Sequence, residues 1–222
     1  MIWTFTARMG DFLLLWPVAS WYYKNKGQKI HFVITKNYFM HEKMVPLLEY
    51  QPFTEKVTLV DIPPDIHVFN PANYGVTGEY MNFGFYAHAH NYKGKWTPFY
   101  YADLYQLGVD MDYRVSYPKE DVSKHERVWV ETTPDKKLLY QTIPQRIPQP
   151  ANQLSFNDPL ITNINLAVNA GEVWTNGGGF TILMEFVDKP CTILTNGKDP
   201  WMQFIRANAY PNHPIQHKWI ML

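Results

Sequence analysis

The chain has 222 residues, with 20 basic and 20 acidic side chains and 46% hydrophobic residues. This zero formal net charge excludes an overall electrostatic attraction to nucleic acid or to an anionic membrane, and the apolar content excludes a disordered chain. The single cysteine, Cys191, excludes an intrachain disulfide framework and suits a reducing compartment.

The first half alternates strand and helix patterns. Apolar and β-branched runs predict strands over 1–7, 29–35 and 56–63, and helical periodicity predicts helices over 11–27 and 40–52. Pro17 should bend the first helix or start a fresh turn, and Gly27 should end it. This order is typical of a parallel, doubly wound α/β sheet.

The amino-acid composition changes over residues 63–94, where Asn, Gly, Tyr and His are frequent. Loops and short strands on a binding face are expected there. A helix is predicted over 96–110, with Gly108 as its stop, and a charged linker over 117–126 contains the expected domain boundary.

The second half shows the same alternation of strand and helix patterns. Strand patterns occupy 127–133, 172–176 and 191–195, with a short one over 152–156, while helices are expected over 134–145, 158–171 and 177–187. The proline-rich residues 143–150 are read as a loop. No apolar run is long enough to span a bilayer, and no signal-peptide cleavage site follows the first apolar stretch. The sequence therefore predicts a soluble, cytoplasmic α/β protein.

Four stretches in order carry a family resemblance. "RMGDFLLLWPVASWYYKNKGQKIHFVI", "ADLYQLGVD", "VWVETTPDKKLLY" and "AGEVWTNGGGFTILMEFVDKPCTIL" resemble segments of the bacterial heptosyltransferase-like glycosyltransferases, the ADP-heptose:LPS heptosyltransferase family. The resemblance implies the GT-B fold, two facing Rossmann-like domains with parallel sheets, the second one reduced. It assigns residues 1–122 to an acceptor-side domain and 123–222 to a nucleotide-sugar-binding domain, and it implies transfer with inversion.

Two positions depart from that family's pattern. Asn176 stands where the family usually has an acid before the glycine turn, and a histidine usual in the following helix is absent. These departures concern the donor site more than the fold. They also favour the alternative that the chain is a catalytically inactive nucleotide- or glycan-binding module of the same fold.

Asp11 is the candidate general base, because it follows Gly10 at the point where the first predicted strand ends and its helix begins. The carboxyl ends of parallel strands are where α/β proteins bind their ligands, and sugar transfer needs a group that takes the acceptor proton. Without the resemblance, the same acid could simply interact with the positive end of the helix dipole.

The candidate donor site combines two loops. The turn Asn176, Gly177, Gly178 and Gly179, with the Thr181 hydroxyl, could cradle a diphosphate through backbone amides. Thr132, Thr133 and either Lys136 or Lys137 would add hydroxyls and a point charge to the same phosphates. Each loop taken alone could equally be a strand-to-helix turn or a capped, solvated loop.

The sequence also offers candidates for the acceptor site and for metal binding. Gly10, Glu79, His88, His90 and Lys93 are the candidate acceptor-binding residues. For a transferase of this family, the expected acceptor would be a glycan, such as a lipopolysaccharide core sugar in a bacterium, or a modified DNA base in a phage enzyme. Metal sites at Asp110/Asp112 and at His88/His90 are disfavoured because each supplies too few ligands. No cofactor is expected, since a GT-B enzyme uses helix amides and Lys in place of a metal and the nucleotide sugar is a co-substrate.

A hydrolase or another nucleotide-processing enzyme is a third class to consider. The sequence has neither a Gly-x-Ser-x-Gly nucleophile elbow nor a P-loop. This class is therefore disfavoured relative to a glycosyltransferase.

Overall fold

The computed structural model describes residues 1–6, 9–37, 41–63, 66, 68–83, 113–130, 143–155, 157–195 and 217–221. The chain divides into two compact units, residues 1–117 and residues 118–222. The sequence places the boundary after residue 122. Both positions lie in residues 113–125, a stretch with no helix or strand.

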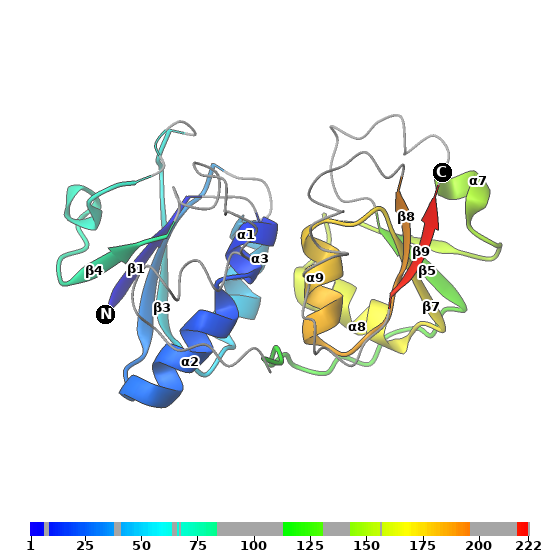
Figure 1. Cartoon of the computed structure of the whole chain (residues 1–222), viewed down its shortest axis with the longest axis horizontal. Helices are drawn as coiled ribbons and strands as arrows, with labels where there is room; N and C mark the ends of the chain where they lie inside the picture. Colours follow the sequence, from blue (N-terminus) through cyan, green and yellow to red (C-terminus); the bar gives the residue numbers. More distant parts are fainter. Residues whose placement is uncertain are drawn as a thin grey trace. The chain divides into compact units, whose positions relative to one another are not determined.

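The first unit is built on a parallel sheet. Its described strands, in the order β3-β2-β1-β4, are β1 (Ile2–Phe5), β2 (Ile30–Thr35), β3 (Thr54–Val60) and β4 (Tyr80–Asn82). The described helices are α1 (Met9–Leu13), α2 (Trp16–Lys26), α3 (His41–Glu49) and the 3-10 helix η1 (Pro71–Tyr74). Figure 1 shows α1, α2 and α3 on one side of this sheet.

The predicted break at Pro17 is confirmed. Pro17 lies in the first turn of α2, where its missing N–H costs no hydrogen bond. Gly27 then ends α2 with a left-handed backbone (φ 65°), and its N–H donates to the Tyr23 carbonyl over 2.9 Å. The expected helix therefore forms as two, and the shorter one, α1, carries Asp11.

Aromatic rings fill the helical side of the first sheet. Phe12 of α1 lies 4.7 Å from Phe5 and 5.8 Å from Phe32 between ring centroids, and Trp3 lies 6.0 Å from Phe32. All four side chains are fully buried. Because Phe12 is packed against two strands, α1 cannot rotate about its axis without breaking this cluster.

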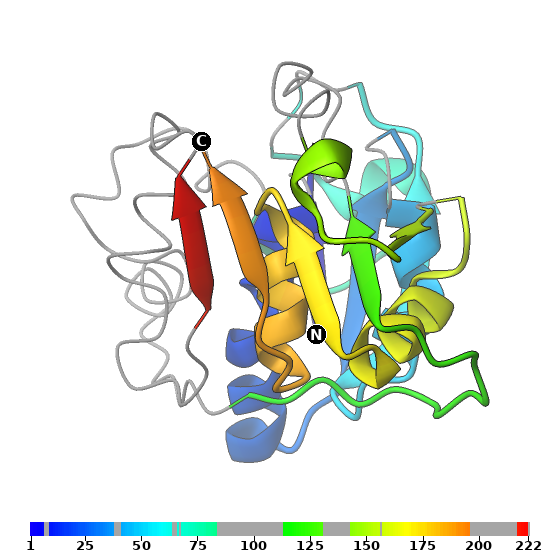
Figure 2. The same cartoon turned by 90° about the vertical axis from the view of Figure 1, so that its right-hand side faces the viewer.

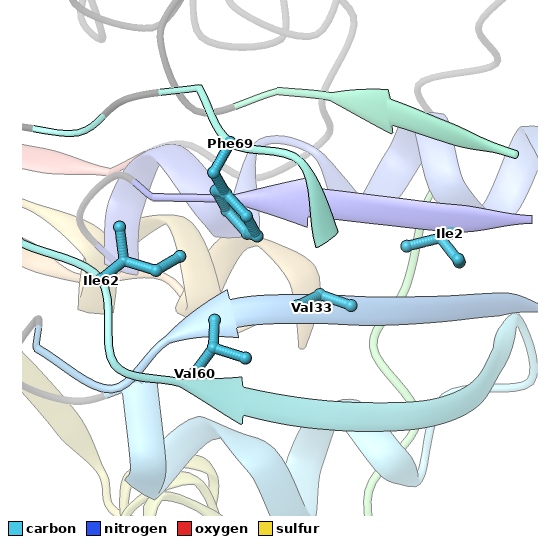
Figure 3. Close-up of a cluster of buried hydrophobic side chains, with 5 residues drawn as sticks. All are labelled: Ile2, Val33, Val60, Ile62 and Phe69. Carbon is cyan, nitrogen blue, oxygen red and sulfur yellow. The ribbon is translucent and has the colours of Figure 1, made fainter. Parts of the chain in front are cut away.

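On the opposite side of the sheet, the described cover is a loop together with the short helix η1. Ile2, Val33 and Val60 pack there against Ile62 and Phe69 (Figure 3). Partly buried side chains around η1, Tyr74 and Val76, complete the cluster. The expectation of loops and short strands after residue 63 agrees with η1 and β4 in its described part.

The second unit has a second parallel sheet. Its described strands, in the order β6-β5-β7-β8-β9, are β5 (Arg127–Val130), β6 (Asn152–Leu154), β7 (Glu172–Thr175), β8 (Thr192–Thr195) and β9 (Lys218–Met221). Its helices within the described ranges are α7 (Ile143–Arg146), α8 (Leu160–Asn169) and α9 (Gly179–Phe186). Figure 2 shows the strands side by side in front of α8 and α9.

The α/β class with two parallel sheets is confirmed. Two details differ from the sequence reading. Residues 143–146 form one helical turn, α7, which overlaps both the expected helix over 134–145 and the expected proline-rich loop over 143–150. Pro144 is compatible with it because the first turn of a helix tolerates proline. Strand β9 was not predicted. The expected helix over 96–110 and residues 134–142 of the expected helix over 134–145 lie outside the described residues.

Within the described ranges, no helix is both long and apolar enough to cross a membrane. The longest described helix, α2, has 11 residues. A bilayer-spanning helix needs about 20.

Gly171 allows β5 and β7 to approach at their amino ends. A Cβ at this position would lie 2.7 Å from the backbone carbonyl oxygen of Glu126, which accepts the Glu172 N–H over 3.0 Å. Gly171→Ala is therefore expected to lower the free energy of unfolding by about 1–3 kcal/mol, as measured by urea denaturation. Gly27→Ala is the comparison, because a Cβ there meets nothing within 4 Å and only the left-handed backbone is strained. A Gly171→Ala loss below about 0.5 kcal/mol would contradict this account of the sheet.

Candidate active site

Asp11 lies in the first turn of α1, directly after β1. The helix follows the carboxyl end of a parallel strand, which is the edge where α/β proteins bind ligands. Asp11 is buried, with 8% of its surface exposed. The Phe12 contacts described above fix α1 against the sheet, so the hydrophobic core sets the position of the Asp11 backbone.

Gly10 lies beside Asp11 within α1 and is half-buried. Its carbonyl accepts the Leu14 N–H over 3.1 Å, which closes the turn that holds Asp11. The structure therefore brings together Gly10 and Asp11, two of the residues selected from the sequence, at one edge of the first sheet.

Glu79 lies at the opposite edge of the same sheet. It immediately precedes β4, whose first residue, Tyr80, pairs with Ile2 in β1, and the Glu79 carbonyl accepts the Ile2 N–H over 3.0 Å. Burial raises the pKa of Tyr22, and the nearby Glu79 carboxylate raises this pKa further. Asp11 follows the carboxyl end of β1, whereas Glu79 precedes the amino end of the parallel strand β4, so the structure does not bring Glu79 and Asp11 together.

The glycine turn follows β7 in the second unit. Gly177 (φ 93°) and Gly178 (φ 82°, ψ −159°) have left-handed backbones that side chains other than glycine rarely adopt. The turn is held from the strand, since the buried Thr175 Oγ1 accepts the Gly177 N–H over 3.1 Å. The backbone therefore requires glycine at positions 177 and 178.

Helix α9 begins at Gly179, and Gly178 provides no side-chain cap. The first amides of an α-helix have no partner within the helix, so a helix start of this kind can accept an anion. Gly178 and Gly179 are half-buried, whereas Asn176 and Gly177 are buried. The accessible part of the turn is therefore the backbone of Gly178 and Gly179.

Thr181 lies in the first turn of α9 and is fully buried. Its N–H donates to the Gly178 carbonyl over 3.1 Å, but its Oγ1 has no hydrogen-bond partner among the described residues. A buried hydroxyl without a partner is costly. The Thr181 hydroxyl is therefore a buried polar group that the described residues do not satisfy.

Seven selected residues lie outside the described part of the chain. They are Thr132, Thr133, Lys136 and Lys137 on the donor side, together with His88, His90 and Lys93 on the acceptor side. The disfavoured metal pair Asp110 and Asp112 lies outside it as well. Within the ranges that the structure describes, no group of three or more His, Cys, Asp or Glu side chains is placed to hold a metal ion.

Cys191 is buried beside Glu185 and Lys189. Burial raises the pKa of the Cys191 thiol well above its ordinary value, and the Glu185 carboxylate raises this pKa further. The thiolate is the reactive form of cysteine. Cys191 is therefore a core residue and not a nucleophile, as the apolar sequence around it indicates.

Comparison with known proteins finds relatives through structure and not through sequence. No family model matches the chain, and no curated protein sequence matches it. A glycosyl transferase of family 9 from Veillonella parvula superposes with a TM-score of 0.63 at 13% identity, over 100% of this chain and 84% of its own. E. coli heptosyltransferase WaaC with ADP gives a TM-score of 0.54 at 14% identity, over 94% and 97%.

A third similar structure is the dodecameric, iron-containing glycosyltransferase TibC from enterotoxigenic E. coli. Its TM-score is 0.52 at 15% identity, and the match covers 88% of this chain but only 57% of TibC. The chain thus spans little more than half the length of that relative. Identities this low establish the fold alone. The chain therefore has the heptosyltransferase-like, GT-B-type α/β fold.

Proposed function

We propose that the chain is a glycosyltransferase that moves a sugar from a nucleotide-diphosphate donor to an acceptor hydroxyl with inversion. The observation that carries this proposal is the conjunction of the fold with two features at strand ends. One is the buried acid Asp11 after β1, and the other is the glycine turn before α9. The fold supplies the class of reaction, and the two features supply its chemical groups.

In the proposed reaction the acceptor oxygen attacks the anomeric carbon of the donor sugar. The bond from that carbon to the β-phosphate oxygen breaks, and the nucleoside diphosphate leaves from the opposite face. Asp11 takes the proton of the acceptor hydroxyl. A positioned carboxylate of this kind contributes about 100- to 10,000-fold to a rate. Its fixed place on α1 supports this role, because a base must be held within hydrogen-bond reach of the proton.

The donor diphosphate is proposed to bind at the start of α9. The half-buried backbone of Gly178 and Gly179 offers amide groups to an anion, and the Thr181 hydroxyl and Asn176 stand in the same turn. Thr132, Thr133 and one of Lys136 and Lys137 are proposed to add charge and hydroxyls. Because these groups neutralise phosphate charge without a metal ion, the proposal includes no metal and no cofactor.

The acceptor is proposed to bind beside Asp11, with Gly10 and, from the loop region, His88, His90 and Lys93. A glycan hydroxyl fits a neutral chain with no overall basic field, and a modified DNA base is the second acceptor class. Glu79 is left out of this acceptor site, because it precedes β4 at the other edge of the sheet. The cytoplasm is the proposed location, since nucleotide sugars are the proposed substrates.

The experiment that tests the donor site is a panel of nucleotide sugars, measured by thermal stabilisation. A ligand at 100 times its dissociation constant stabilises the native state by about 2.7 kcal/mol. One donor class is expected to raise the melting temperature of the parent chain. Gly178→Ala should weaken this binding at least tenfold, because alanine cannot adopt φ 82° with ψ −159° without about 1–3 kcal/mol of strain.

Gly75→Ala is the matched control outside the turn. Gly75 follows η1 and also has a left-handed backbone (φ 78°), so this substitution strains the backbone without changing the proposed donor site. If both variants bind the donor as the parent does, the turn is not the donor site. If the parent binds no nucleotide sugar at all, the proposed function itself fails.

The alternative function is a nucleotide- or glycan-binding module without catalysis. Asn176 favours it, because an amide stands where the related enzymes usually have an acid. The two functions differ in turnover and not in binding. A module would be stabilised by the donor yet release no nucleoside diphosphate from it.

A further inference from the structure

The chain passes once between its two units, between Tyr117 and Pro118. The residues on either side, 113–120, are called the connector below. They form no helix or strand, so side chains from the two units decide how the connector is held.

In the first unit the connector is held by Gln51, which follows α3 and is 2% exposed. The Gln51 amide nitrogen donates to the Ser116 carbonyl over 2.7 Å, and its oxygen accepts the Ser116 N–H over 3.0 Å. The same oxygen accepts the Tyr113 hydroxyl over 2.7 Å. The second amide hydrogen donates to the Leu47 carbonyl over 2.6 Å. One buried side chain therefore fixes both backbone groups of Ser116 to α3.

In the second unit Asn165 of α8 has the corresponding role. It is 1% exposed, and its amide nitrogen donates to the Pro118 carbonyl over 3.0 Å. Its oxygen accepts the Glu120 N–H over 3.1 Å. The remaining amide hydrogen donates to the Ile161 carbonyl, also over 3.0 Å, which keeps the side chain on its own helix. Asn165 thus binds the connector on both sides of Lys119.

The side chains of Gln51 and Asn165 leave only a short segment between the two units. Gln51 holds Ser116 to the first unit, and Asn165 holds Pro118 to the second. The chain therefore passes from one unit to the other within residues 116–118. Pro118 restricts this segment further, because its ring fixes its own φ and limits the backbone of the preceding residue to extended conformations.

We infer that Gln51 and Asn165 clamp the connector and confine motion between the two units to a stiff joint at residues 116–118. Losing either clamp lengthens the joint by several residues and lets the units take more relative orientations. This inference does not depend on which reaction the chain catalyses. In an enzyme whose substrates bind to both units, such a joint would restrict the orientations that the units have to search.

The test measures the distance distribution between nitroxide labels on two exposed positions, Lys26→Cys and Gln153→Cys, by pulsed electron spin resonance. Asn165→Ala and Gln51→Ala are each expected to broaden this distribution. Asn163→Ala is the matched control, because Asn163 is a buried amide on the same helix that donates to Ser155, outside the connector. Pro118→Gly should broaden the distribution without removing any side-chain hydrogen bond, which keeps the test decisive if a clamp variant folds poorly.

Amide hydrogen exchange checks each clamp separately. In Asn165→Ala the Glu120 N–H should exchange on the order of tenfold faster while the Ser116 N–H keeps its rate, and Gln51→Ala should give the reverse. The inference is overturned if Asn165→Ala and Pro118→Gly leave the distance distribution as narrow as in Asn163→Ala. It is also overturned if both connector amides already exchange in the parent at the rate of an unprotected chain.

Discussion

Asp11→Asn is expected to lower the rate of sugar transfer by about 100- to 10,000-fold while leaving donor affinity unchanged. The substitution keeps the shape of the side chain and removes its ability to accept a proton at neutral pH. Because the donor is proposed to bind through the turn before α9, its affinity should not depend on the charge of Asp11. Steady-state kinetics and donor titration of the two proteins measure both quantities.

Two controls separate catalysis from helix stabilisation. Asp158→Asn removes an exposed acid that likewise stands near the start of a helix, α8, and should leave transfer unchanged. If Asp11 only interacts with the helix dipole, Asp11→Asn should lose about 0.3–1 kcal/mol of stability and keep its turnover. That result would remove Asp11 from the mechanism without affecting the assignment of the fold.

His217→Ala is expected to lower the free energy of unfolding of the second unit by about 3–5 kcal/mol. His217 is buried before β9, and its Nε2 lies 3.0 Å from Glu185 Oε1 of α9. Its Nδ1 accepts the Cys191 N–H over 3.0 Å. The substitution removes both bonds at once. It leaves a buried carboxylate, of which Oε2 already has no partner among the described residues, and a backbone donor without an acceptor.

Urea denaturation of the full chain measures this loss. Glu185→Gln is the matched comparison, because its amide oxygen can still accept from His217 Nε2, so it should cost clearly less than His217→Ala. If His217→Ala costs less than about 1 kcal/mol, the pair does not anchor β9. Since β9 binds the sheet through β8 alone in the described part of the chain, its loss would expose that edge of the second sheet.

The sequence predicted those helices and strands whose own residues show an apolar pattern or a backbone constraint. The strands β1, β2 and β3 are dense in apolar and β-branched residues, and Pro17 and Gly27 mark the limits of α2 through their own backbone constraints. Strand β9 could not be predicted in this way. Its four residues become a strand by pairing with β8, with Ile193 opposite Trp219, which is a long-range interaction with no local signal.

For the candidate site, the sequence predicted where two groups lie and not what they do. Asp11 and the glycine turn lie between a strand and a helix as expected, because consecutive residues signal where a strand ends and a helix begins. Glu79 was selected as an acceptor-binding candidate, but its place before β4 depends on the register that pairs Tyr80 with Ile2, which has no local signal. Gln51 and Asn165 gave no signal, because an amide near an amphipathic helix resembles a surface residue until its distant partners are known.

The release of nucleoside diphosphate from a panel of nucleotide sugars, followed with the parent chain and with Asp11→Asn in the presence of candidate glycan acceptors, tests the central claim most directly. The account predicts that one donor class is turned over by the parent, with a matching gain of one sugar in the mass of an acceptor, and that Asp11→Asn binds this donor without releasing the nucleotide. Equal turnover by both proteins would contradict the assignment of Asp11, and binding without turnover in both would identify a binding module instead.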